Sequence, residues 1–512
     1  MRRRVDHIKN QLIVRLREQL ESVTRRLFAE EGRNRSAGND LRQVLGSYRS
    51  LELTDQAELQ LQELLFKSPL KEILRSSKEL VSPTYPPEHS ASVFLKMNNE
   101  ALSLLHEIGA KFQDLQINLT ANSFWPVYVC LVLEIPEIFN YAHTDRFQKM
   151  YLVAMQFVRA LEESLNEDQR GILHKSAPYA AFMSKWNLPT YYRIRYQETC
   201  NNLDACSSGL LELATKPNSS DLRLALSQTL HQELIKIWQE DGIFLNPLRH
   251  RFLKLTLELL RSYLTLAKDE SLKDPKTIFS ERQARPAERP ESVQNLDQGL
   301  ALINDLVLFG TGDILLCVEL KLPETKTVSQ ALKEEFSQTA DALLMQQSNV
   351  LVHECTILLR QMSDIPRQYR RTNREHPTAS SPYVACLVSV FDRLAKAAEL
   401  PSKNVVVRPQ LEKLISVCLD AVIGKFHAQL VEVLTGIRKA GDSLRKLREA
   451  RIGASSSSDN KPSSNSDEDK MHHQLLIDAG DFTTKILATF PEQKARLGSS
   501  LDQLSHLIQH DK

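Results

Sequence analysis

Glycine is scarce in this chain. Only 16 of its 512 residues are Gly, less than half of the ~7% that is usual in proteins. Strand-rich folds need glycine in tight turns and bulges, whereas long helices do not. The scarcity therefore favours an all-α fold, although the spacing of residues alone does not determine how the helices are connected.

The spacing of apolar residues agrees with helices. Near the start of the chain, large apolar residues recur every three or four positions, at Val5, Ile8, Leu12, Leu16, Leu20, Val23 and Leu27. This spacing predicts one apolar stripe on a helix of about six turns. Such a stripe needs a partner, either later in this chain or on another protein.

Proline positions and shifts in composition divide the chain into six predicted segments. They are an N-terminal helical region (1–84), a middle region of helical bundles (85–267), a charged, proline-containing flexible linker (268–295), a C-terminal helical domain (296–452), a disordered acidic and Ser-rich linker (453–470) and C-terminal helices (471–512).

Composition narrows the functional class. Hydrophobic residues make up 42% of the chain, which is enough for buried cores, and the formal net charge is +1. This balance of charges excludes the overall basic excess that is typical of nucleic-acid-binding proteins, but it does not exclude a local basic patch. The seven cysteines are scattered, which suits a reducing compartment. The longest uncharged stretch, residues 115–133, contains polar residues and Pro126, so we predict buried helices and a cytosolic protein.

Motifs that would carry chemistry are weak. Cys200 and Cys206 have no further Cys or His pair at metal-binding spacing, and His353-Glu354 continues with Ile357 in place of a second histidine. His472-His473 follows the acidic linker, and Gly310-Thr311-Gly312 matches a turn between helices better than a phosphate loop. We therefore predict no catalytic residue, no cofactor site and no metal site, and expect that the protein is not an enzyme.

Two basic clusters allow two interpretations. The first contains Arg367, Arg370, Arg371 and Arg374; the second contains Arg438, Lys439, Arg445, Lys446, Arg448 and Arg451. Either cluster could contact acidic lipid headgroups or an acidic partner helix. Alternatively, the arginines cap helix C-termini and pair with carboxylates of the same chain, or line a solvated helix face. We favour the second interpretation for both clusters.

The three tryptophans, Trp125, Trp186 and Trp238, are predicted to lie in the core, because each large ring buries about 200 Å². Trp186 with Leu188, Pro189 and Tyr192 is typical of the entry to a helix.

Several segments, taken in order, resemble the subunit 2 family of the conserved oligomeric Golgi complex. They are residues 123–126, 146–162, 186–196, Trp238 with 241–245, 251–263, 365–375, 443–447, and the acidic linker before Gln474-Leu475. The resemblance implies an elongated succession of helical bundles of the helical-rod tether type. It implies a non-catalytic subunit of a vesicle-tethering complex that acts in retrograde intra-Golgi transport and Golgi organisation, and indirectly in glycosylation.

The resemblance also implies partners and a place in the cell. The partners are subunits 1, 3 and 4 of the complex, with SNAREs and Rab GTPases as further candidates, on the cytoplasmic side of the Golgi membrane. Relative to the family, the front of the chain looks like the remnant of a longer N-terminal helical rod. Two alternatives remain open: a helical scaffold or adaptor of another, exocyst-like tether, and a helical enzyme whose site is assembled from distant residues.

Overall fold

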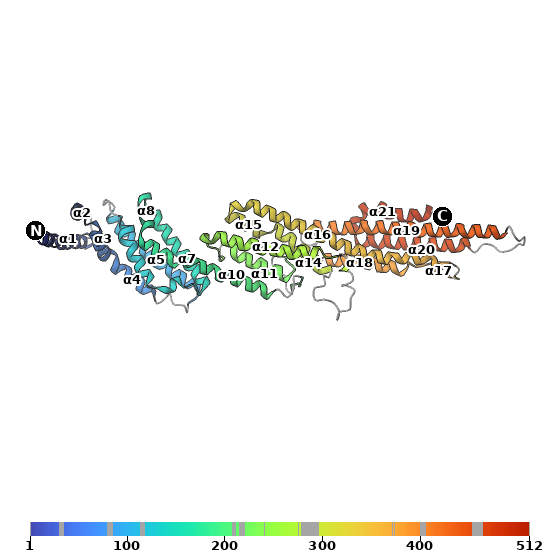
Figure 1. The fold of residues 1–512 in the computed structure, drawn as a ribbon, viewed down its shortest axis with the longest axis horizontal. Coiled ribbons are helices and arrows are strands. Elements are labelled where there is room, and N and C mark those ends of the chain that lie inside the picture. The colour runs from blue at the N-terminus through green and yellow to red at the C-terminus, as the bar shows by residue number, and fades with distance from the viewer. Residues whose placement is uncertain are drawn as a thin grey trace. The chain divides into compact units, whose positions relative to one another are not determined.

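The computed structural model confirms the all-α class. It describes residues 2–510 apart from 30–34, 79–84, 113–117, 207–210, 215–220, 240, 275, 278–295, 371, 373, 400–405 and 453–463. Within this part of the chain there is no strand, and the one β contact is an isolated antiparallel bridge between Leu213 and Leu224. The helices form two compact units, each described by itself below (Figure 1).

The first unit contains residues 1–198 together with 245–248. Its helices are α1 (Arg2–Ala29), α2 (Arg35–Ser50), α3 (Thr54–Leu61), η1 (Gln62–Lys67), α4 (Ser68–Lys78), α5 (Pro87–Lys111), η2 (Thr120–Phe124), α6 (Trp125–Leu133), η3 (Pro136–Phe139), α7 (Thr144–Glu163), α8 (Glu167–Lys175), α9 (Ala177–Lys185), the first part of α10 (Leu188–Ala205) and η4 (Asn246–Leu248). In Figure 1, α5 and α7 lie side by side in this unit.

Aromatic side chains build the core of the first unit. Trp125 has no exposed surface and Trp186 is 4% exposed, which confirms both as core residues. The Trp125 ring contacts Phe182 at 5.4 Å between centroids, and the Trp186 ring contacts Tyr151 at 5.3 Å, both edge to face. The Phe124 ring also lies 6.5 Å from the Phe157 ring. Through Phe124, Phe157, Tyr151 and Trp186, three of the segments that resemble the Golgi family (123–126, 146–162 and 186–196) therefore pack together.

Asparagines fix the starts of two helices in this unit. Asn166 caps α8 in a reciprocal capping box with Gln169, and Asn187 accepts a hydrogen bond of 3.2 Å from the Thr190 N–H at the start of α10. Pro189 then occupies the first turn of α10, where its missing N–H costs nothing. The predicted helix entry after Trp186 is therefore confirmed.

The N-terminal stripe finds a partner within the chain for part of its length. Leu16, Leu20 and Val23 are buried where α1 packs against α2, whereas Leu12 is 43% exposed. Much of the uncharged stretch is also buried, as predicted: η2 and α6 contain Trp125, Tyr128 and Val132, none of which is exposed, although Cys130 is exposed.

The second unit contains residues 199–244 and 249–512. Its helices are the end of α10, α11 (Ala225–Trp238), α12 (Arg249–Ser271), α14 (Leu296–Thr311), α15 (Asp313–Lys321), η5 (Pro323–Thr325), α16 (Lys326–Leu359), η6 (Arg360–Asp364), α17 (Ile365–Tyr369), α18 (Pro382–Ala398), α19 (Arg408–Ile452), α20 (Ser464–Thr489), η8 (Pro491–Gln493) and α21 (Lys494–His510). The long helix α16 packs along both α14 and α19. Trp238, 2% exposed, lies in this core and donates from Nε1 to Thr256 Oγ1 at 2.9 Å.

Gly310-Thr311-Gly312 forms the predicted turn between helices. Helix α14 ends at Thr311 and α15 begins at Asp313. A Cβ atom on Gly312 would lie 2.4 Å from the Leu308 carbonyl oxygen, closer than any side chain tolerates. Glycine is thus needed here for close backbone approach.

The two predicted linkers lie mostly outside the described residues, at 275, 278–295 and 453–463. The structure differs from the prediction at their edges. Residues 268–271 form the last turn of α12. Gln346 on α16 donates hydrogen bonds to the carbonyl of Glu270 in this turn and to the carbonyl of Lys273, just after the helix ends. Residues 464–470, predicted to be disordered, form the first turns of α20. The negative charge of Asp467 lies there at the positive end of the helix dipole, which stabilises the helix. The six-segment division as a whole stays a prediction.

Two helical stretches are long and apolar enough to cross a membrane by length and composition: Leu296–Lys321 and Arg408–Leu447. In their most apolar windows, 61% and 39% of the residues are buried within the structure. Core helices of a helical bundle meet the same criterion.

Candidate functional site

The residues whose sequence pattern most resembled that of metal ligands make contacts with other side chains or with the backbone. Cys206 Sγ lies 3.1 Å from Thr229 Oγ1, Glu354 pairs with Arg393, and the His472 ring Nδ1 lies 2.8 Å from the Glu468 carbonyl oxygen. Among the described residues, no group of three or more His, Cys, Asp or Glu side chains converges in a way that could hold a metal ion.

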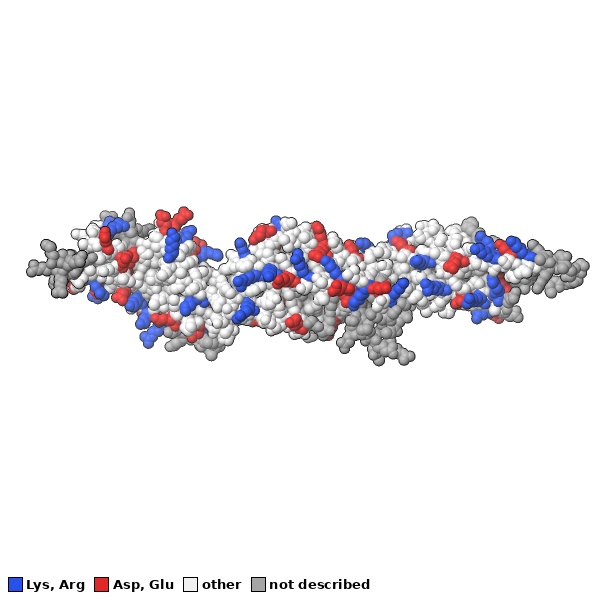
Figure 2. All heavy atoms as spheres, viewed as in Figure 1, with Lys and Arg blue, Asp and Glu red and all other residues white. Residues whose placement is uncertain are grey.

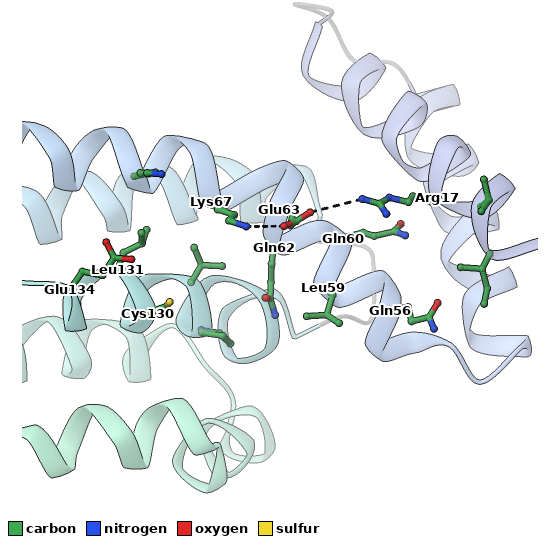
Figure 3. Close-up of a pocket in the computed structure, with 15 residues that line it drawn as sticks. Arg17, Gln56, Leu59, Gln60, Gln62, Glu63, Lys67, Cys130, Leu131 and Glu134 are labelled. Carbon is green, nitrogen blue, oxygen red and sulfur yellow. Dashed lines mark hydrogen bonds and ion pairs between the residues drawn. The ribbon is translucent and has the colours of Figure 1, made fainter. Parts of the chain in front are cut away.

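A groove of about 700 Å³ opens in the first unit between α1, the α3–η1 helix and α6 (Figure 3). Its lining includes exposed apolar side chains, with Val14 at 54% and Leu59 at 58% exposure. Glu63 accepts a hydrogen bond of 2.8 Å from Lys67 Nζ and lies 4.0 Å from Arg17 Nη2 across the groove.

Glu63 and Lys67 in this groove do not suit proton transfer. The hydrogen bond from Lys67 lowers the pKa of Glu63, and the same contact raises the pKa of Lys67. Both groups are therefore held in their charged forms around neutral pH, whereas a general acid or base needs a pKa near the working pH. The groove can receive an apolar side chain or helix face, which is a binding role.

The first basic cluster lies in a segment that links two helices of the second unit. We call residues 365–381 the arginine segment: it begins with the short helix α17, and α18 starts directly after it at Pro382. Tyr369, at the end of α17, is buried, whereas Arg367, Arg370 and Arg374 are exposed.

One polar face of α20 holds the arginine segment in place. Lys470, Gln474, Asp478 and Asp481 follow one another at helical spacing, so they lie on one face. Lys470 Nζ donates to the Arg374 carbonyl at 2.9 Å, and Gln474 Nε2 donates to the Ala379 carbonyl at 3.0 Å.

The end of the segment is fixed in the same way. Asp481 Oδ2 accepts a hydrogen bond of 2.6 Å from the Ser380 hydroxyl. At the other end, the Tyr369 hydroxyl donates to Gln474 Oε1 at 2.7 Å. Two carbonyls of the segment are therefore bound from α20, while the side chains of Arg367, Arg370 and Arg374 are exposed. Arg371 lies outside the described residues.

The arginines themselves make few ion pairs within the chain. Arg367 Nη1 lies 3.7 Å from Asp364, but the Arg367 side chain is 87% exposed, so the pair contributes little. Arg374 Nη1 donates to Gln368 Oε1 at 3.1 Å. Among the described residues, no carboxylate forms an ion pair with Arg370 or Arg374. The intrachain pairing that we favoured is thus present at Arg367 and is weak.

The second basic cluster lies on α19, and its described side chains Arg438, Lys439, Arg445 and Lys446 are exposed. We call these four residues the α19 basic face. The side chains of Arg448 and Arg451 lie outside the described residues. A Cβ on Gly441 of α19 would lie 2.4 Å from Glu468 Oε1, so the start of α20 packs directly against this part of α19.

Sequence reasoning missed the polar face of α20. Its residues were assigned either to the disordered linker or to the C-terminal helices. Their spacing of three and four positions was the signal in the sequence that could have indicated one helix face.

Comparison with known proteins gives one consistent result. The profile of the family described as "COG complex component, COG2, C-terminal" matches residues 184–479, which include the arginine segment and the α19 basic face. The chain is 28% identical over 393 residues to the human protein named "Conserved oligomeric Golgi complex subunit 2", covering 70% of this chain and 52% of the human one. Proteins of the same name from Drosophila melanogaster and Arabidopsis thaliana are each 25% identical.

These two alignments cover 97% and 69% of this chain, and 70% and 48% of the Drosophila and Arabidopsis proteins. The chain thus spans about half the length of its human and Arabidopsis relatives.

Proposed function

This chain belongs to the family described as "COG complex component, COG2, C-terminal", and from that membership we propose that it is a non-catalytic subunit of a multisubunit vesicle-tethering complex. The complex would act in retrograde intra-Golgi transport and in Golgi organisation. Its effect on glycosylation would be indirect, through the correct placement of the enzymes that glycosylate.

The family match over residues 184–479 is the observation that carries this proposal. The structure supports it in one respect: segments that resemble the family pack against one another within each unit. In the second unit the Trp238 ring lies 5.3 Å from Phe244, and the Phe244 ring lies 6.1 Å from Phe252. The shared residues thus support a shared helical framework.

A binding role rather than a catalytic one is also supported by the surfaces of the described residues. The groove between α1 and α6 presents exposed apolar side chains beside groups that stay charged. The arginine segment presents exposed guanidinium groups, which can bind anions. Both features suit contacts with other macromolecules.

The proposed partners are subunits 1, 3 and 4 of the Golgi complex, with SNAREs and Rab GTPases as further candidates. The proposed location is the cytoplasmic side of the Golgi membrane, where the protein would be peripheral. The runner-up is a scaffold or adaptor of an exocyst-like tether, which the same helical framework would allow.

Affinity purification of the tagged chain from cells, followed by quantitative mass spectrometry, tests the proposal. We expect enrichment of subunits 1, 3 and 4 over a tagged, unrelated all-helical cytosolic protein. Enrichment of exocyst subunits instead would select the runner-up, and enrichment of neither set would reject the proposed function.

A further inference from the structure

We propose that the arginine segment and the α19 basic face together form a surface that binds anionic lipid headgroups at a membrane. The inference deepens the proposed function and rests on it, since it names the surface by which this subunit would meet the Golgi membrane.

The two basic clusters are far apart in the sequence but meet at the same end of the second unit. Helix α20 joins them: Lys470 donates to the Arg374 carbonyl, and Glu468, two residues earlier, lies against Gly441 of α19. Figure 2 shows blue spheres of Lys and Arg, with red spheres among them, over this end of the unit where α17, α19 and α20 come together. A positive field from two clusters adds where they adjoin.

The arginine segment holds exposed arginine side chains on a backbone that is fixed by α20. Its backbone is tied to α20 at Arg374, Ala379 and Ser381, so little additional ordering is needed on binding. Arg370 and Arg374 are exposed and form no ion pair with a described carboxylate. Guanidinium groups in this state match phosphate oxygens, which they can bind through two parallel N–H donors.

Carboxylates near this end moderate the charge but do not cover the arginines. Asp467 and Glu468 are partly buried at the start of α20, and Glu468 is turned toward α19. The exposed carboxylates Asp364, Glu375, Asp442 and Asp469 remain. They make the surface weaker than a purely basic one, so we expect binding that depends strongly on salt.

A membrane fits this surface better than an acidic protein helix because of the apolar residues on α19. Leu447 is 60% exposed and Leu444 is partly exposed, three residues apart on one face of the helix. Arg445 and Lys446 lie between them in the sequence. An exposed leucine face flanked by cations is typical of helices that lie in the membrane interface, where the leucines enter the acyl boundary and the cations reach the headgroups.

Flotation of the whole chain with lipid vesicles tests this proposal. We expect it to float with vesicles of phosphatidylcholine and phosphatidylserine, to stay behind with pure phosphatidylcholine, and to dissociate as salt is raised. The variants Arg370→Gln with Arg374→Gln, and Arg445→Gln with Lys446→Gln, should each bind roughly fivefold more weakly per substituted residue. The variant Leu447→Ser should weaken binding without changing the salt dependence.

The matched control is Lys254→Gln with Arg261→Gln on α12, which removes the same charge from exposed positions of the same unit. It should bind anionic vesicles within about twofold of the wild type. Thermal unfolding followed by circular dichroism verifies that every variant is folded.

Two results would overturn the proposal: equal loss in the α12 control, or wild-type protein that does not float with anionic vesicles. If the second result came with loss of a protein partner when Arg370 and Arg374 are replaced, the surface would be assigned to an acidic protein. Recovery of the Golgi complex subunits by affinity purification reports separately on the proposed function, and normal recovery with failed flotation would reject only this inference.

Discussion

The backbone N–H of Ser381 donates a hydrogen bond of 2.7 Å to the Oδ1 atom of Asp478, whose side chain has no exposed surface. Ser381 is the N-cap of α18, so the carboxylate lies at the positive end of that helix. Gln474 Nε2 donates to the same oxygen at 2.8 Å. This contact fastens the end of the arginine segment to α20 and thereby determines where α18 begins.

Replacing Asp478 should loosen this junction. We expect Asp478→Ala to lower the free energy of unfolding by about 2–3 kcal/mol, because the partly buried Ser381 N–H and the Gln474 amide both lose their acceptor. Urea unfolding measures the change. The control Asp392→Ala removes an exposed carboxylate of α18 that accepts a hydrogen bond from the Thr489 hydroxyl, and should cost less than about 0.5 kcal/mol. Equal stability of Asp478→Ala and wild type would contradict the role given to this carboxylate.

Two tyrosines beside Asp478 should respond differently to loss of the hydroxyl. The Tyr369 hydroxyl donates to Gln474 Oε1 at 2.7 Å, so Tyr369→Phe should cost about 1 kcal/mol. The Tyr383 hydroxyl is buried without a hydrogen-bond partner among the described residues, and burial together with the Asp478 charge raises the pKa of Tyr383. Tyr383→Phe should therefore be neutral or stabilising in the same urea measurement. The opposite order would show that the hydrogen bonds are differently arranged.

The aromatic core of the first unit should be sensitive to truncation. Trp186 contacts Phe139, Phe147 and Tyr151, with ring centroids 4.8, 5.4 and 5.3 Å away. We expect Trp186→Ala to cost about 3–5 kcal/mol, since neighbouring rings cannot fill the cavity. Leu152→Ala, at a position 45% exposed on the same helix as Tyr151, should cost far less. Thermal unfolding by circular dichroism compares them, and similar midpoints would refute the core assignment.

Asp305 predicts a pH dependence of stability in the second unit. It is fully buried, and its oxygens accept the N–H groups of Arg223 and Leu224 at 2.8 and 2.9 Å. Burial raises the pKa of Asp305 from 3.8 to about 6, although these hydrogen bonds oppose the shift. Because the folded-state pKa is the higher one, the contribution to stability is fully present below the unfolded pKa and is lost as pH rises through about 6.

Urea unfolding of wild type and Asp305→Asn between about pH 4 and pH 7 isolates this contribution. The stability of the wild type relative to the variant should fall by up to about 3 kcal/mol as pH rises across that range. A stability difference that does not change with pH would mean that Asp305 titrates normally in the folded protein.

The sequence predicted those features that follow from the size and spacing of single residues. Tryptophan rings are large and apolar, so their burial followed directly, as did the helix entry at Pro189 and the turn at Gly312. The all-α class followed from scarce glycine and a helical apolar period. Each of these depends on interactions within a few residues or on burial alone.

The candidate surface could not be predicted in this way. Arg374 meets Lys470, and Gly441 meets Glu468, only because α17, α19 and α20 pack together. Residues 464–470 are polar and acidic, which is typical of a linker, yet they form helix because their contacts with α19 and the arginine segment compensate the weak local preference. Tertiary contacts between distant segments decide both outcomes.

Reconstitution with purified sister subunits tests the central claim most directly. The whole chain, co-expressed with Golgi complex subunits 1, 3 and 4, is separated by size-exclusion chromatography, and the mass of each peak is measured by light scattering. We predict that the chain elutes with those subunits in one peak whose mass includes all of them. Elution of the chain alone, at its own 58.4 kDa, while the other subunits assemble without it would contradict the assignment.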